Sequence, residues 1–117
     1  MILNLTQHFA SKEQIEEGVF EPEDKEKVKK LLTFNELPSK EEIKERARLL
    51  TGIAIVEGAE KAMIGGAPYL MSSLEKKLKE FDIQPVYAFS KRIVEETEKD
   101  GEIIKKSIFK HIGFIEV

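Results

Sequence analysis

Residues 62–92 constrain the fold of this chain more than any other stretch. They read AMIGGAPYLMSSLEKKLKEFDIQPVYAFSKR. An apolar run over Ala62–Gly65 leads into a Gly-Gly pair, a segment with helical spacing follows, and a second apolar run covers Val86–Phe89. Parallel strands need a long crossover, usually a helix, and such crossovers are right-handed. The stretch therefore predicts a compact βαβ unit.

The N-terminal half adds one more strand and several helices. Ile2–Leu5 is apolar except for Asn4 and predicts a buried strand. A further helix is expected from about Pro22 to Phe34. Three sites where Ser is followed three residues later by Glu or Gln predict helix starts with a capping box. These sites are Ser11–Gln14, Ser39–Glu42 and Ser72–Glu75.

The helix that starts after Ser39 is expected to end near Gly58. Apolar residues at intervals of four, three and four carry its buried face from Ile43 to Ala54. The run Ile53–Val56 taken alone also fits a strand, and that alternative stays open.

The last quarter of the chain has the pattern of a β-hairpin. Asp100-Gly101 separates two strand-like runs, and Asp-Gly suits the two positive φ angles of a type I′ turn. We expect an antiparallel hairpin over about residues 92–117. Together these features predict one α/β domain over residues 1–117, a small Rossmann-like three-layer domain with parallel core strands and a C-terminal antiparallel hairpin.

Composition excludes several classes of function. The formal net charge of −3 gives no global basic field, so binding of duplex nucleic acid is not expected. The chain has no Cys and two His, which excludes thiolate chemistry and argues against a metal site or a metal cofactor. Its apolar runs are too short for a membrane span and no signal pattern opens the chain, so a cytoplasmic protein is expected. A charged fraction of 35% without Cys or Trp hints at a thermophile.

The carboxyl ends of the three predicted parallel strands bring polar residues to one edge of the sheet. Open α/β sheets bind ligands at that edge. Gly residues allow close approach of an anion, a helix N-terminus favours it, and Arg or Lys neutralises it. His8, Lys91 and Arg92 are the predicted catalytic residues, and the predicted ligand-binding residues are Thr6, Gln7, Gly65, Gly66, Ser72 and Ser90.

Each of these residues also has a structural interpretation. The Gly-Gly pair fits a plain strand-to-helix turn, and GGAPYL lacks the spacing of both GxGxxG and a P-loop. His8 fits a structural hydrogen bonder, and His111 fits an ordinary surface or interface residue. Lys91 and Arg92 fit a charged strand edge that resists aggregation.

Three segments also resemble known families. ILNLTQHFA, AMIGGAPYLMSSLEKKL and PVYAFSKR resemble an uncharacterised bacterial and phage family that has no activity attached to it. More distantly, a strand that ends in a hydroxyl residue followed by a His is similar to the small CRISPR-associated ring nucleases. That resemblance implies a Rossmann-like homodimer that binds and cuts a cyclic oligoadenylate without metal, with Thr6, His8 and residues 90–92 around the phosphodiester.

The hypothesis that combines these points is binding of an anionic small molecule, a nucleotide or a cyclic oligonucleotide. Its sharpest form is a metal-independent phosphodiesterase that works as a homodimer. The alternative is a non-enzymatic protein–protein interaction or ligand-sensing module, in which the edge of the hairpin pairs with a partner through Ile104, Ile108 and Ile112.

Overall fold

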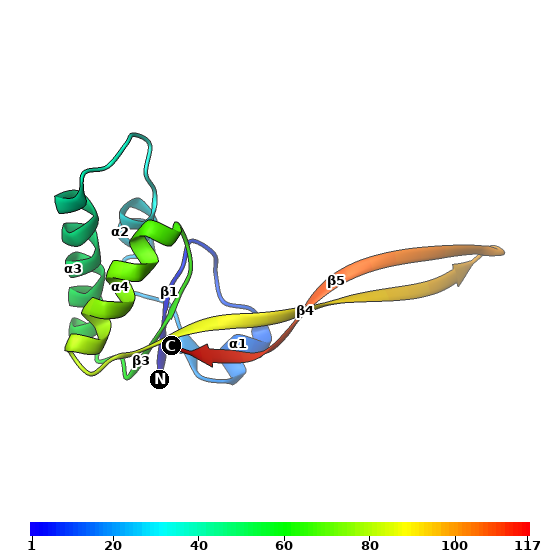
Figure 1. Cartoon of the computed structure of the whole chain (residues 1–117). Coiled ribbons are helices and arrows are strands. Elements are labelled where there is room, and N and C mark those ends of the chain that lie inside the picture. The colour runs from blue at the N-terminus through cyan, green and yellow to red at the C-terminus, as the bar shows by residue number, and fades with distance from the viewer.

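A five-stranded mixed sheet forms the centre of the molecule, with the order β2-β1-β3-β4-β5. The computed structural model describes residues 1–117 (Figure 1). The strands are β1 (Ile2–Leu5), β2 (Val19–Phe20), β3 (Lys61–Ile64), β4 (Gln84–Lys99) and β5 (Glu102–Glu116). The helices are α1 (Lys12–Glu16), α2 (Lys25–Leu32), α3 (Lys40–Val56) and α4 (Pro68–Glu80).

The predicted parallel core is confirmed. β1 pairs in parallel with β3, with Leu3 opposite Ala62, and β3 pairs in parallel with β4, with Met63 opposite Val86. The sequence did not predict β2, which pairs in parallel with the other side of β1. Two residues are too few to give a period-2 pattern, so this strand carries no signal of its own.

The three longer helices pack on one face of the sheet. Side chains of β1 and β3 on this face join buried residues of α2, α3 and α4 in a single apolar cluster of 15 residues. The other face carries only a small cluster, formed by Ile2, Val19, Met63 and Val86. Figure 1 shows α1 on the opposite side of the sheet from the three longer helices. The expected three-layer arrangement is therefore not confirmed, because the second face lacks a comparable helical layer.

Two of the three predicted helix starts are confirmed. Ser11 makes both hydrogen bonds of a capping box with Gln14, and the Ser39 side chain accepts from the Glu42 backbone N–H. The start at Ser72 is wrong, because α4 begins at Pro68 and Ser72 lies inside the helix. Pro at the first helical position is preorganised for a helix start, and here it overrides the later Ser-x-x-Glu pattern.

The start of α2 differs from expectation, and the end of α3 decides between the two alternatives for Ile53–Val56. Asp24, not Pro22, precedes the first turn of α2 and accepts a hydrogen bond from the Lys27 backbone N–H. Ile53–Val56 is helical, so the strand alternative for that run is wrong. None of the helices combines the length and the apolar character needed to cross a membrane.

The hairpin is confirmed, but it is longer than predicted. β4 and β5 pair from Val86 opposite Glu116 to Lys99 opposite Glu102, so the hairpin begins before residue 92. Asp100 and Gly101 have φ angles of 54° and 79°, as the type I′ turn requires. Figure 1 shows the outer part of the two strands extending away from the body, and we call residues 90–111 the arm. The arm gives the molecule its longest dimension of 59 Å.

His111 connects the base of the arm to α1. Its side chain is 3% exposed, and its Nε2 lies 3.2 Å from Oε1 of Glu17, the C-cap residue of α1. Its ring packs on Phe114 at 4.8 Å between ring centroids. The surface position expected for His111 is therefore wrong and the interface alternative stays a prediction, whereas the side chain of His8 is exposed.

Replacement of His111 by Ala should lower stability, because it removes a buried ring at the junction of arm and body. We expect a loss of about 1–2 kcal/mol, or a fall in Tm of roughly 4–10 °C in a domain of this size. His8→Ala serves as the matched control and should leave Tm within about 1–2 °C of the wild type. Differential scanning calorimetry of both variants checks this, and an equal loss in both would contradict it.

Candidate functional site

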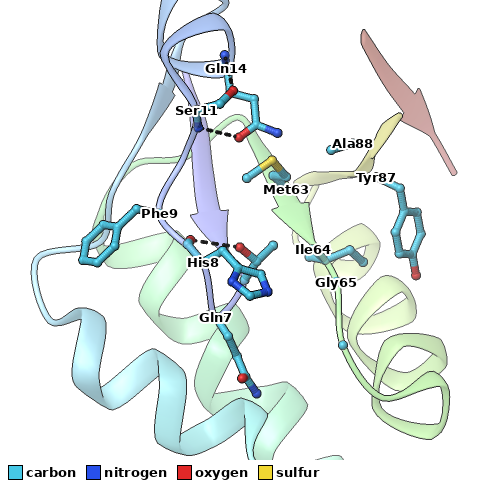
Figure 2. A pocket seen from close by; sticks show the side chains of 12 residues that line it. Gln7, His8, Phe9, Ser11, Gln14, Met63, Ile64, Gly65, Tyr87 and Ala88 are labelled. Carbon is cyan, nitrogen blue, oxygen red and sulfur yellow. Dashed lines mark hydrogen bonds between the residues drawn. The ribbon is translucent and has the colours of Figure 1, made fainter. Parts of the chain in front are cut away.

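A cavity lies where the order of the parallel strands reverses. The chain leaves β1 for β2 on one side and returns for β3 on the other, so the reversal point is between β1 and β3. Ligands of open α/β sheets bind beyond the carboxyl ends of the strands at such a point. The cavity here measures about 610 Å³ (Figure 2). Its lining is Thr6, Gln7, His8, Phe9, Ser11, Gln14, Met63, Ile64, Gly65, Gly66, Tyr87 and Ala88.

Asn4 holds the loop that forms one wall of the cavity. It is fully buried in β1, and its Oδ1 accepts from the backbone N–H of Thr6 at 3.0 Å and from the Thr6 hydroxyl at 2.7 Å. Its Nδ2 donates to the carbonyl oxygen of His8 at 2.8 Å and to the Glu21 carboxylate at 3.1 Å. Because a buried amide must be hydrogen-bonded, Asn4 fixes the path of residues 6–8.

Glu21 and Lys25 extend this network. Glu21 accepts from the Ala10 backbone N–H at 2.8 Å and from the Lys25 ammonium at 2.9 Å. Burial by itself would raise the pKa of Glu21, but the hydrogen bonds from Ala10, Lys25 and Asn4 outweigh it, so the pKa lies below its ordinary value. Lys25, the first residue of α2, also donates to the carbonyl oxygen of His8 at 2.9 Å, so the His8 end of the loop is tied to α2.

The loop therefore has a fixed backbone and a free imidazole. The carbonyl oxygen of His8 accepts from both Asn4 and Lys25. Its side chain is exposed, and Figure 2 shows the ring directed across the cavity toward the β3 side. The Gln7 side chain points away from His8. It donates to the carbonyl oxygen of Leu32 and to the Thr33 hydroxyl, and these hydrogen bonds fasten the loop to the C-terminal end of α2.

The opposite wall is the turn from β3 into α4. Gly66 has a φ of 153°, which L side chains rarely adopt, so this position requires glycine. A Cβ on Gly65 would lie 3.6 Å from the Thr6 methyl group, so the two loops approach closely there. Ala67 precedes Pro68 and offers no side-chain cap, so the N-terminus of α4 has no side-chain acceptor for its N–H groups.

The third wall is apolar. Met63 and Ala88 come from β3 and β4, whereas the Tyr87 side chain projects from the other face of β4, toward α4 (Figure 2). Burial and a 2.6 Å hydrogen bond from its hydroxyl to the Glu75 carboxylate raise the pKa of Tyr87. Tyr87 therefore keeps its proton at neutral pH, and His8 contributes the only imidazole in the lining.

Five of the nine predicted site residues line the cavity together: Thr6, Gln7, His8, Gly65 and Gly66. Ser72 lies elsewhere, in a hollow between α3 and α4 that also contains Arg48 and Lys76. Ser90, Lys91 and Arg92 lie within β4 at the start of the arm, where Arg92 donates to the Ser107 hydroxyl at 3.1 Å. None of these three is among the residues that line the cavity in a single copy of the chain.

Sequence reasoning missed Asn4, Glu21, Gln14 and Tyr87. Asn4 had a usable signal, because one amide inside an apolar strand must find partners and marks a structured loop nearby. Glu21 had none, since its role depends on the approach of residues 17 positions apart. No group of three or more His, Cys, Asp or Glu side chains is placed to hold a metal ion.

Comparison with known proteins gives one finding. A family model described as the Uncharacterized protein MJ1673 family matches residues 1–115. No protein of curated function and no solved structure matches the chain.

Glu21→Gln should reveal the charged network that supports the loop. Because the pKa of Glu21 is lowered from 4.5, its contribution is complete above that pH and disappears as pH falls through the folded-state pKa. At pH 7 we expect the variant to be about 1–3 kcal/mol less stable than the wild type. The difference should shrink by more than half at pH 3, as measured by urea unfolding at both pH values.

Glu16→Gln, at an exposed position of α1, is the matched control and should change stability little at either pH. A difference for Glu21→Gln that is the same at pH 7 and pH 3 would contradict the charged network.

Proposed function

The chain belongs to the uncharacterised MJ1673 family, a membership that brings no activity with it, and from its own cavity we propose that it binds a nucleotide or a related phosphodiester. One observation carries the proposal. The cavity lies at the reversal point of the parallel strands and is bounded by the Gly65-Gly66 turn into α4. Its volume of about 610 Å³ falls within the range of small-molecule sites, roughly 300–1,000 Å³.

The Gly65-Gly66 turn suits the phosphate end of such a ligand. Glycine lets a phosphate approach the backbone, and α4 begins there with a positive dipole end. Pro68 has no N–H, and the Leu70 and Met71 N–H groups donate to the Ala67 carbonyl oxygen. Tyr69 therefore supplies the free N–H of the first turn. The lining contains no carboxylate that would repel an anion. Glu21, the acidic residue nearest to the loop in the hydrogen-bond network, is neutralised by Lys25.

The apolar wall suits the base and sugar. Met63 and Ala88 offer an apolar surface against which a flat base packs. Ser11 and Gln14 of the α1 capping box stand at the rim of the cavity and can hydrogen-bond ribose hydroxyls or base edges. A mixed lining of this kind favours a nucleotide over a bare inorganic anion.

The sharper form of the proposal is cleavage of a cyclic oligonucleotide without metal. A ribose 2′-hydroxyl attacks the adjacent phosphorus, the P–O5′ bond breaks, and the products are a 2′,3′-cyclic phosphate and a 5′-hydroxyl. The 2′-hydroxyl proton passes to the His8 imidazole, and the departing 5′-oxygen takes a proton from the imidazolium or from water. This form draws on the exposed imidazole and on the resemblance to ring nucleases, and it needs positioning more than an enzyme nucleophile.

The proposal treats the arm residues Ser90, Lys91 and Arg92 separately from the residues that line the cavity. In one copy of the chain they lie on the arm, so the phosphate is held by the Gly65-Gly66 turn, and any charge from the arm is additional. Arg92→Ala tests this directly. If Arg92→Ala still cleaves the ligand, the chemistry is assigned to His8 without help from the arm. If Arg92→Ala no longer cleaves it, the base of an arm must reach the bound phosphodiester.

Ligand binding should appear as thermal stabilisation. The probes are adenosine 5′-monophosphate, cyclic tetra-adenylate and cyclic hexa-adenylate, with inorganic phosphate as the reference. A ligand at 100 times its Kd stabilises the fold by about 2.7 kcal/mol, which is roughly 10 °C in Tm for a domain of this size. Gly65→Leu should abolish the shift, because its side chain enters the space between the two loops. Gly52→Leu, in open space on α3, is the matched control.

Cleavage is followed by chromatography of the same mixtures. His8→Ala should keep the thermal shift and lose roughly 100-fold or more in rate, the usual contribution of a general acid or base. Binding without products would make the protein a sensor rather than an enzyme. A flat panel, or a shift that survives in Gly65→Leu, would contradict the proposed site.

A further inference from the structure

The arm exposes apolar side chains on a ribbon of two strands. An isolated two-stranded hairpin is marginally stable in water. Val94, Ile103 and Phe109 are 56%, 69% and 77% exposed. Single exposed apolar residues are ordinary, but this number on one narrow ribbon indicates a surface that another molecule covers.

Val94, Ile103 and Phe109, the most exposed apolar side chains of the arm, share one face of the ribbon. Arg92 is opposite Phe109, Val94 is opposite Ser107, and Glu98 is opposite Ile103. By the alternation along β4, this is the face that carries Val86 in the body, the sparsely covered second face of the sheet. We call it the open face of the arm.

The opposite face of the arm is less accessible. There Ile93 faces Ile108 across the ribbon, and both are half-buried. Near the base this face is the one on which Tyr87 contacts Glu75 of α4, so the helical layer lies over it. A second ribbon therefore has more room on the open face.

Charge is divided between the two strands of the arm. The middle of β4 carries Glu95, Glu96 and Glu98, and the part of β5 beside it carries Lys105 and Lys106. An acidic strand next to a basic strand matches a copy of itself when β4 of one ribbon lies over β5 of the other. In that arrangement the two arms are related by a two-fold axis that lies between them and runs parallel to their length. Both tips therefore point in the same direction.

We propose that the occupant of the open face is the arm of a second copy of this chain. In this arrangement Glu96 lies over Lys105 of the second copy, and Arg92 lies over its Phe109, a cation–π pair. The reversed arrangement, with tips opposed, stacks β4 on β4 and places Glu over Glu. The body of each copy extends from the β4 side of its own ribbon, so the two bodies fall on opposite sides of the paired arms.

A charge exchange with mixing tests the pairing. Glu96→Lys and Lys105→Glu each place like charges at the two symmetric contacts, and like charges that face each other are destabilising. Sedimentation velocity at 150 mM salt should show a dimer for the wild type and a dimer Kd about tenfold weaker for each variant alone. An equimolar mixture of the two variants should return to the wild-type Kd as a heterodimer, because each of its two contacts again joins a lysine to a glutamate. Damage to the folding of the arm itself would not be repaired by mixing.

Glu95→Lys and Lys106→Glu, on the opposite face, are the matched control. They exchange the same charges across the same ribbon and should leave the dimer Kd within about threefold of the wild type. A wild type that stays monomeric at 100 µM, a mixture that stays weak, or a loss that follows the control pair would each overturn the proposal. The result is independent of ligand binding at the cavity.

Discussion

The buried amide of Asn4 is the interaction on which the shape of the candidate site depends. An amide inside a parallel strand costs free energy unless its donors and acceptor are satisfied. Here the partners are supplied by the chain just after β1 and by Glu21 just after β2. The same hydrogen bonds that satisfy Asn4 thus join the ends of two adjacent strands. They set the loop whose exposed residue is His8.

The second face of the sheet carries few covering residues, and this explains the position of both the cavity and the arm. The cavity lies beside Met63 and Ala88, two strand residues that a third layer of helices would cover. Farther along, β4 and β5 leave the body with nothing over the same face. Three helices on the other face supply most of the buried apolar surface, and this side adds only the small cluster of Ile2, Val19, Met63 and Val86. Beyond that cluster and the short α1, no helix covers this side of the sheet.

The βαβ unit and the parallel core were predictable from the sequence because their signals are local. Apolar runs, a Gly-Gly turn and Asp-Gly each restrict a few neighbouring residues, and those restrictions survive folding. The continuation of β4 beyond Phe89 was not predictable. Ser90-Lys91-Arg92 is polar because β4 leaves the body there, yet pairing with β5 continues, and polarity alone cannot separate a loop from an exposed strand.

The same reasoning separates the parts of the site that were predicted from those that were missed. Thr6, His8 and Gly66 directly follow strands that run in parallel, so topology alone brings them together. Ser72 was misplaced because Pro68 starts α4 one turn earlier. Tyr87 and Glu75 meet only through the packing of α4 on the sheet, a contact 12 positions apart that no local pattern records.

Backbone amide chemical shifts test the site most directly. We expect titration of the ¹⁵N-labelled protein with adenosine 5′-monophosphate and with cyclic tetra-adenylate to move the signals of Gly65, Gly66 and Tyr69 most, together with those of residues 6–8. The amides around Ser72 in the hollow between α3 and α4 should stay still. Shifts confined to that hollow, or no shifts at millimolar ligand, would contradict a nucleotide site at the end of β1 and β3.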